Sequence, residues 1–343
     1  MGKKANILLI YTGGTIGMVK EYATGALKAF NFQKLLKHIP ELEQLDCNIN
    51  SVSFKNPIDS SNMNPSYWVE MAELIEGHYS NHDGFVILHG SDTMSYSAAA
   101  LSFMLEHLSK PVIFTGSQLP IGDLRTDAKE NLITSIQIAS ATHKGEPVIQ
   151  EVGLYFEYKL YRGNRTTKIN AEHFQAFNSP NHPPLAESGV HLKIHKPYLL
   201  KRTKTKQPLL VHKKMDERVA ILKLFPGLSQ ELLNAMLNTP KLKVLVLETY
   251  GSGNAPTCDW FINRLESAIL KGLHIINVSQ CSGGSVSMGQ YETSKKLASI
   301  QLIDGKDLTT EAAITKAMYL IGANVSDKLF KTIFETSIRG EMH

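Results

Sequence analysis

The sequence predicts an α/β fold made of two α/β domains. Short apolar runs rich in β-branched residues recur along the chain, and amphipathic stretches lie between them. The runs are continuous rather than alternating, which is typical of parallel strands that are buried on both faces. The chain has 343 residues, whereas an average domain has roughly 150, so each half is long enough to bury its own core.

The apolar runs and the amphipathic stretches follow one another in a regular order. The predicted strands are 7–11, 85–88, 112–115, 152–156, 219–225, 244–247 and 275–278. The predicted helices are 67–78, 95–108, 131–142, 229–237, 259–271 and 310–321. Strand-then-helix alternation of this kind indicates α/β layering with right-handed crossovers.

A basic stretch divides the chain. Between His191 and Lys214 the sequence has eight Lys or Arg residues and no Asp or Glu, whereas acids outnumber bases in the rest. An RNA- or anion-binding patch and a solvated linker both fit this composition, and the lack of interleaved aromatic residues favours the linker. We therefore expect an N-terminal domain over 1–190, a basic linker over 191–216 and a C-terminal domain over 217–343.

Composition argues against several classes of protein. The formal net charge of +4 is too small to indicate a nucleic-acid partner or an anionic membrane surface. The apolar run near the N-terminus is too short for a signal peptide or a membrane span. Three scattered cysteines, without a CxxC spacing, predict neither a disulfide framework nor a zinc site. We expect a cytoplasmic protein with reduced thiols and no bound metal.

Polar loops follow five of the predicted strands. Each loop combines glycine with hydroxyl, carboxamide or carboxylate groups, and the loops are 12–17, 89–93, 116–118, 248–254 and 279–284. Glycine lets the backbone approach a ligand closely and leaves N–H groups free to bind an anion or a developing oxyanion. Because ligands of open α/β sheets bind beyond the carboxyl ends of the strands, we expect these loops to converge on one site.

The loops do not match common cofactor or nucleophile motifs. Residues 12–17 read TGGTIG, which differs from the GxGxxG dinucleotide fingerprint, and the chain has no GxSxG or HExxH motif. A hydroxyl nucleophile without a Ser-His-Asp pattern needs another base, and Lys168 is a candidate, although taken by itself an ordinary surface lysine is the better interpretation. We expect His89 to be a hydrogen-bonded core residue rather than a catalyst.

Several motifs in a fixed order resemble those of bacterial cytoplasmic (type I) L-asparaginases. They are YTGGTIGM at 11–18, DSSNM at 59–63, HGSDTM at 89–94, TGSQLP at 115–120, LYRGNRTTK at 160–168, YGSGNAP at 250–256 and the loop 280–284. The resemblance extends over essentially the whole chain. It implies a larger N-terminal flavodoxin-like parallel-sheet domain and a smaller C-terminal α/β domain. It also implies hydrolysis of the side-chain amide of L-asparagine, no cofactor, and a homo-oligomer of intimate dimers, commonly a homotetramer.

The resemblance also implies catalytic roles for particular residues. Thr15 corresponds to the primary nucleophile of the family, and Ser91, Asp92 and Lys168 correspond to a second cluster that assists proton transfer and oxyanion stabilisation. The family usually has threonine where this chain has Ser91, so the hydroxyl is kept while the methyl group that restricts its rotamers is absent.

Other residues are implied in substrate binding. The loop that holds the α-carboxylate and α-amino groups of the substrate corresponds to Asp59, Ser60 and Ser61, together with Asp92 and Ser91. Asn254 corresponds to an asparagine that reaches the site, apparently from a neighbouring subunit. A zwitterionic substrate needs carboxylates for its ammonium group and N–H or O–H donors for its carboxylate, which these residue types supply.

Two questions stay open in the sequence. Relatives have a tyrosine after the first loop that activates the nucleophile, and here Tyr22 and Tyr291 are both candidates because the aligned position is Ala26. The function also has alternatives, namely a relaxed glutaminase-asparaginase, an amidotransferase subunit of the asparaginase-like kind, and a non-catalytic amino-acid-binding sensor. One extra methylene changes substrate binding by only about 1–3 kcal/mol, so the sequence does not separate asparagine from glutamine.

Overall fold

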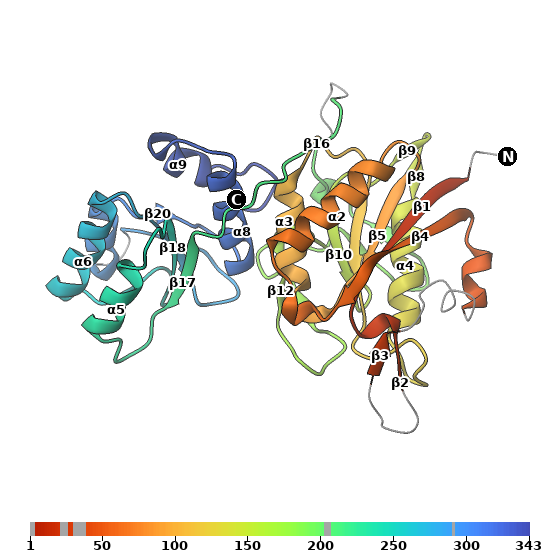
Figure 1. The fold of residues 1–343 in the computed structure, drawn as a ribbon, viewed down its shortest axis with the longest axis horizontal. Coiled ribbons are helices and arrows are strands. Elements are labelled where there is room, and N and C mark those ends of the chain that lie inside the picture. Colours follow the sequence, from red (N-terminus) through yellow and green to blue (C-terminus); the bar gives the residue numbers. More distant parts are fainter. Residues whose placement is uncertain (1–3, 21–26, 30–38, 202–206, 290–291) are drawn as a thin grey trace. The chain divides into compact units, whose positions relative to one another are not determined.

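The computed structural model describes residues 4–20, 27–29, 39–201, 207–289 and 292–343. The chain divides into two compact units, which we call unit 1 (Met1–Lys213) and unit 2 (Lys214–His343). Each unit is an open sheet with helices packed against it (Figure 1). The prediction of two α/β domains, of which the first is larger, is confirmed.

Unit 1 is built on five parallel strands. They are β1 (Ala5–Gly13), β4 (Cys47–Ile58), β5 (Gly84–Leu88), β7 (Val112–Thr115) and β10 (Val152–Phe156). Their spatial order is β4-β1-β5-β7-β10, and counting these strands along the chain gives 2-1-3-4-5. This is the flavodoxin-like order of doubly wound sheets, so the expected topology of the N-terminal sheet is present.

The sheet continues beyond β10 with antiparallel strands β11 (Lys159–Arg162), β14 (Ala186–Glu187) and β15 (Lys193–Ile194). Strand β16 (Leu210–Val211) pairs with β6 (Leu105–Glu106) elsewhere in unit 1. Part of the stretch that we expected to be a linker therefore forms strands, of which β15 pairs with the nearby β14 and β16 with the distant β6. The same pairing ends the helix predicted over 95–108 early, because its last residues extend into β6.

Among the described residues of unit 1, three helices cover its sheet. They are α2 (Pro65–His78), α3 (Met94–Met104) and α4 (Ala128–Ser140), and α2 lies beside α3 (Figure 1). Helix α4 packs on the sheet face that carries Ile7 and Leu9, whereas the alternate residues Leu8 and Ile10 are also fully buried. Burial of both faces explains why β1 appears in the sequence as a continuous apolar run.

Unit 2 has a four-stranded parallel sheet whose spatial order follows the chain. Its strands are β17 (Val219–Lys223), β18 (Val244–Thr249), β19 (His274–Ser279) and β20 (Ile303–Asp304). Its helices are α5 (Gln230–Leu237), α6 (Asp259–Leu270), α7 (Glu292–Ser299), α8 (Thr310–Gly322) and α9 (Asp327–Phe334). Across the described parts of both units, no helix is long and apolar enough to cross a bilayer.

Candidate active site

The strand order of unit 1 reverses between β1 and β5. From β1 the chain goes to β4 on one side, and it then returns to β5 on the other side. In open α/β sheets this reversal leaves a crevice at the carboxyl ends of the two strands. The 3-10 turns Thr15–Gly17 and Ser91–Thr93 both lie there, directly after β1 and β5.

Glycines let three loops meet at this crevice. If Gly13 had a Cβ atom, that atom would lie 2.0 Å from the carbonyl oxygen of Ile58. A Cβ atom on Gly14 would lie 2.5 Å from the backbone nitrogen of Gly90. A Cβ atom at Gly90 would lie 2.5 Å from Oγ of Ser60. Gly13 and Gly14 also have φ angles of 131° and 85°, which favour glycine. The loops that follow β1, β4 and β5 therefore touch one another along their backbones.

The side chains of Lys168, Ser91 and Asp92 form a cluster. Lys168 lies on β12 (Thr167–Lys168), and its Nζ donates to Oγ of Ser91 at 2.9 Å and to Oδ1 of Asp92 at 2.7 Å. The Lys168 side chain is 18% exposed, whereas that of Asp92 is 65% exposed. The lysine is thus withdrawn into the protein, while the carboxylate faces solvent and is accessible to a ligand.

A further residue, Gln118, joins this cluster. Oγ of Ser91 donates to Oε1 of Gln118 at 3.2 Å. The backbone N–H groups of Gln118 and Leu119 donate to the Asp127 carboxylate at 2.9 and 3.1 Å. Burial raises the pKa of Asp127, and these N–H groups act in the opposite direction. The sequence placed Gln118 in a polar loop but gave no reason to assign it a role.

Thr15 lies at the start of the turn after β1 and is half-buried. Its hydroxyl makes no hydrogen bond to any other residue in the described part of the chain. The Tyr11 ring lies beneath the turn, because a Cβ atom at Gly17 would lie 2.4 Å from it. Burial raises the pKa of Tyr11 to about 12, so its hydroxyl is protonated near neutral pH and donates to the carbonyl of Gly14 at 3.5 Å.

The loop after β4 supplies a carboxylate at the same end of the sheet. Oδ1 of Asp59 accepts hydrogen bonds from the backbone N–H and the hydroxyl of Ser61, both at 2.8 Å. These two bonds lower the pKa of Asp59, so that it is ionised at physiological pH. Thr93 donates to the carbonyl of Ser60 at 2.8 Å, which ties this loop to the one after β5.

His89 is fully buried under the loop after β5. Its Nδ1 lies 2.7 Å from the carbonyl oxygen of Gly90, which only accepts, so Nδ1 carries the proton. Its Nε2 then accepts from the Ser97 hydroxyl at 2.9 Å, and that hydroxyl accepts from the Trp68 indole N–H at 2.9 Å. Burial lowers the pKa of His89 to about 4. The prediction of a hydrogen-bonded core residue is confirmed.

The remaining predicted site residues belong to unit 2 or lie outside the described residues. Asn254 belongs to unit 2, where its backbone pairs with Tyr250 in the turn after β18. Tyr22 and Tyr291 lie outside the described residues, so the choice between them stays a prediction. Within the described ranges, no group of three or more His, Cys, Asp or Glu side chains could hold a metal ion.

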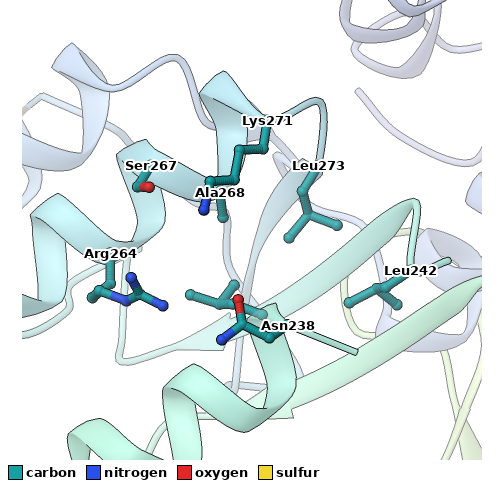
Figure 2. A pocket seen from close by; sticks show the side chains of 8 residues that line it. Asn238, Leu242, Arg264, Ser267, Ala268, Lys271 and Leu273 are labelled. Carbon is teal, nitrogen blue, oxygen red and sulfur yellow. The ribbon is translucent and has the colours of Figure 1, made fainter. Parts of the chain in front are cut away.

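Unit 2 contains a small cavity of about 110 Å³ (Figure 2). It lies between the C-terminal ends of α5 and α6 and the start of β19, at the amino end of the strands rather than the carboxyl end. Arg264 and Lys271 line it together with Ser267. Cations at helix C-termini offset the partial negative charge of the terminal carbonyl groups, so they do not by themselves indicate a ligand.

The sequence was compared with protein-family models. Residues 6–199 match the asparaginase N-terminal domain, and residues 218–334 match the glutaminase/asparaginase C-terminal domain. The chain belongs to the asparaginase family. Its two units thus correspond to the two domains of that family, and the resemblance seen in the sequence motifs is confirmed.

Individual relatives are similar to this protein along its whole chain. The protein is 40% identical over 342 residues to L-asparaginase 1 of Escherichia coli (strain K12), covering 99% of this chain and 98% of that protein. It is 38% identical over 366 residues to the 60 kDa lysophospholipase of Mus musculus, covering 100% of this chain and 63% of that protein. The structure of L-asparaginase I from Vibrio cholerae O1 matches with a TM-score of 0.90 at 37% identity, covering 99% of this chain and 100% of that chain.

Proposed function

We propose that this protein hydrolyses the side-chain amide of L-asparagine to L-aspartate and ammonia. The observation that carries the proposal is the Lys168–Ser91–Asp92 cluster, which lies at the same edge of the sheet as the Thr15 turn. The relatives from E. coli and V. cholerae, which match this chain over nearly all of its length, are both named L-asparaginases.

Substrate recognition uses the charged and polar groups at the rim of the site. The carboxylates of Asp59 and Asp92 bind the α-ammonium group of asparagine, and both carboxylates have exposed surface. The Ser60 hydroxyl and the backbone N–H groups of the glycine loops bind the α-carboxylate, and Ser61, whose N–H and hydroxyl donate to Asp59, holds that carboxylate in place. Holding both ends of the amino acid presents its side-chain amide to Thr15 at a fixed distance, which removes much of the entropic barrier to attack.

Thr15 acts as the nucleophile in this proposal. Its Oγ forms a bond to the amide carbon, the C–N bond breaks, and the hydroxyl proton moves through the Ser91–Lys168–Asp92 cluster to the leaving nitrogen, which departs as ammonia. Backbone N–H groups of the glycine loops stabilise the oxyanion. Water then adds to the resulting β-aspartyl ester, which releases aspartate and restores the threonine hydroxyl.

Two broader features complete the proposal. The protein works in the cytoplasm, which fits its three free cysteines. It assembles as a homo-oligomer, a dimer or a tetramer of intimate dimers, in which Asn254 and either Tyr22 or Tyr291 complete the site. No nucleic-acid, membrane or cofactor partner is needed for the reaction. Activity with glutamine is the alternative that the site geometry leaves open, because that substrate is longer by one methylene.

The test is ammonia release from asparagine and from glutamine, measured in parallel on the full chain. We expect Thr15→Ala to lower kcat by about 1,000-fold or more, because the acyl-enzyme route is lost. Thr142→Ala, at an exposed threonine of unit 1, is the matched control and keeps wild-type activity. Binding of aspartate without ammonia release would identify a sensor, and near-normal turnover by Thr15→Ala would remove Thr15 from the nucleophile role.

A further inference from the structure

The side-chain amide of Gln118 has only one orientation compatible with its neighbours. Its Nε2 lies 3.1 Å from the carbonyl oxygen of Ala171 and 3.1 Å from that of His173. Backbone carbonyl oxygens accept hydrogen bonds and never donate, so the atom facing them is the amide nitrogen. The other end of the amide, which faces Ser91, is therefore the carbonyl oxygen Oε1.

This orientation fixes where the Ser91 proton lies. Because Oε1 of Gln118 only accepts, the Ser91 hydroxyl donates to it, at 3.2 Å. The lone pairs of the Ser91 hydroxyl oxygen then face Nζ of Lys168, which donates to this Oγ atom at 2.9 Å. The hydrogen bonds run in one direction, from Lys168 through Ser91 to Gln118 and on to the two carbonyl groups.

Gln118 is itself held firmly enough to impose this direction. Its backbone N–H donates to the half-buried Asp127 carboxylate at 2.9 Å. The carbonyls that bind its side chain belong to a turn closed by Asn170, whose Oδ1 accepts from the N–H groups of Glu172 and His173 at 2.9 and 2.8 Å. The amide is therefore fixed at both its backbone and its side chain.

Serine needs such a partner more than threonine does. The β-methyl group of threonine restricts χ1, whereas a serine side chain has no such restriction and its hydroxyl turns freely. We propose that Gln118 is a positioning residue, which holds the Ser91 hydroxyl in the one orientation that turns its oxygen to Lys168. This inference rests on the proposed amide hydrolysis, in which that cluster carries the proton.

The experiment combines Gln118→Met with substitutions of Ser91. Methionine matches glutamine in length but neither accepts from Ser91 nor donates to the turn. We expect kcat for ammonia release to fall about three- to tenfold, the size of one lost hydrogen bond, with KM nearly unchanged. In the Ser91→Thr background the same change should cost much less, because the methyl group takes over the restraint. In the Ser91→Ala background it should cost nothing further.

A matched control and a structural readout complete the test. Gln150→Met removes an amide whose Nε2 bonds only to the Pro147 carbonyl in the described structure, at 3.5 Å, and should leave kcat unchanged. An equal loss of kcat from Gln118→Met in all three Ser91 backgrounds would show a merely structural role and overturn the proposal. So would an unchanged kcat in the single variant.

Failure of the proposed function would be recognised separately. A wild-type chain that releases no ammonia from asparagine or glutamine contradicts the proposed function. In that case crystal structures of the wild type and Gln118→Met decide the positioning role without any turnover. One Ser91 rotamer in the wild type and several in the variant supports it, whereas the same single rotamer in both overturns it.

Discussion

His89 shows at the residue scale how a buried neutral histidine makes the stability of the fold depend on pH. Burial lowers its pKa from 6.5 to about 4, so between these values the unfolded chain binds a proton that the folded chain does not. Stability from this group is therefore fully present above pH 6.5 and is lost as the pH falls toward 4. Acceptance of the Ser97 hydrogen bond at Nε2 needs the neutral ring, whereas Nδ1 donates to the Gly90 carbonyl in either protonation state.

We expect His89→Gln to flatten the pH dependence of stability. From this group alone, the free energy of unfolding of the wild type falls by about 2 kcal/mol between pH 7 and pH 5. The variant lacks that contribution and should lose correspondingly less over the same range. Urea unfolding at both pH values, followed by Trp68 fluorescence, measures the difference. His143→Gln, at an exposed histidine, should keep the wild-type pH dependence; an identical slope in His89→Gln would show that His89 titrates normally.

The turn after β1 shows how an element depends on one residue without a side chain. Gly14 combines a φ of 85° with backbone of Gly90 close to where a Cβ atom would stand, 2.5 Å from its nitrogen. The atoms that this Cβ atom would meet are all backbone atoms of His89 and Gly90 and not the ends of flexible side chains. One of the two loops therefore has to move when a Cβ atom is added. The turn carrying Thr15 would then shift relative to the loop carrying Ser91 and Asp92.

Gly14→Ala should therefore impair catalysis more than folding. A shift of about 1 Å in a reacting group lowers the rate by about 100-fold, and we expect a loss of this size in kcat/KM. Gly77→Ala, on helix α2 with open space at its Cβ position, is the matched control and should keep full activity. Thermal unfolding of both variants separates the two effects. Wild-type kcat/KM in Gly14→Ala would mean that the two loops adjust independently.

At the scale of the whole molecule, unit 2 is closed around its own buried ion pair. Nζ of Lys316, on α8, donates to the carbonyls of Phe334 and Thr336 at 2.7 Å and to the Glu341 carboxylate. Both charged side chains are fully buried. Burial alone would raise the pKa of Glu341, but Lys316 and the N–H of Ile338 outweigh it, so that the pKa lies below its ordinary value and the carboxylate is ionised.

Removing one partner of this pair should destabilise unit 2 and leave unit 1 unaffected. Lys316→Met leaves a buried carboxylate without its cation, which costs about 3–5 kcal/mol. The two tryptophans report the units separately, since Trp68 lies in unit 1 and Trp260 in unit 2. Denaturant unfolding of chains with a single tryptophan measures each transition. Lys328→Met, at an exposed lysine of α9, is the control; an equal change in both transitions would mean that the units unfold together.

Most of the strands that the sequence predicted are buried on both faces, because such strands form continuous apolar runs. Strand β17, at the edge of the sheet of unit 2, is apolar but only partly buried. Strand β4 was missed for the opposite reason. It lies at the edge of the sheet and most of its residues are partly or fully exposed, so its sequence, CNINSVSFKNPI, is largely polar. Strand β4 ends directly before Asp59, for which we propose a role in substrate binding. Strands of two residues such as β15 and β16 were also missed, since two residues are too few to show a hydrophobic period, and β16 in addition pairs with a segment far away in the sequence.

The sequence by itself determined the layered α/β fold, the two units and the order of the glycine-rich loops. Strands buried on both sides of a sheet are locally apolar and tight turns need glycine, so both features leave a local sequence pattern. Only the tertiary structure decided that Lys168 meets Ser91 and Asp92, which lie 77 and 76 positions away, and that Gln118 accepts a hydrogen bond from the Ser91 hydroxyl. The direction of a hydrogen bond depends on which donors and acceptors stand on every side of a group, and folding alone brings those together.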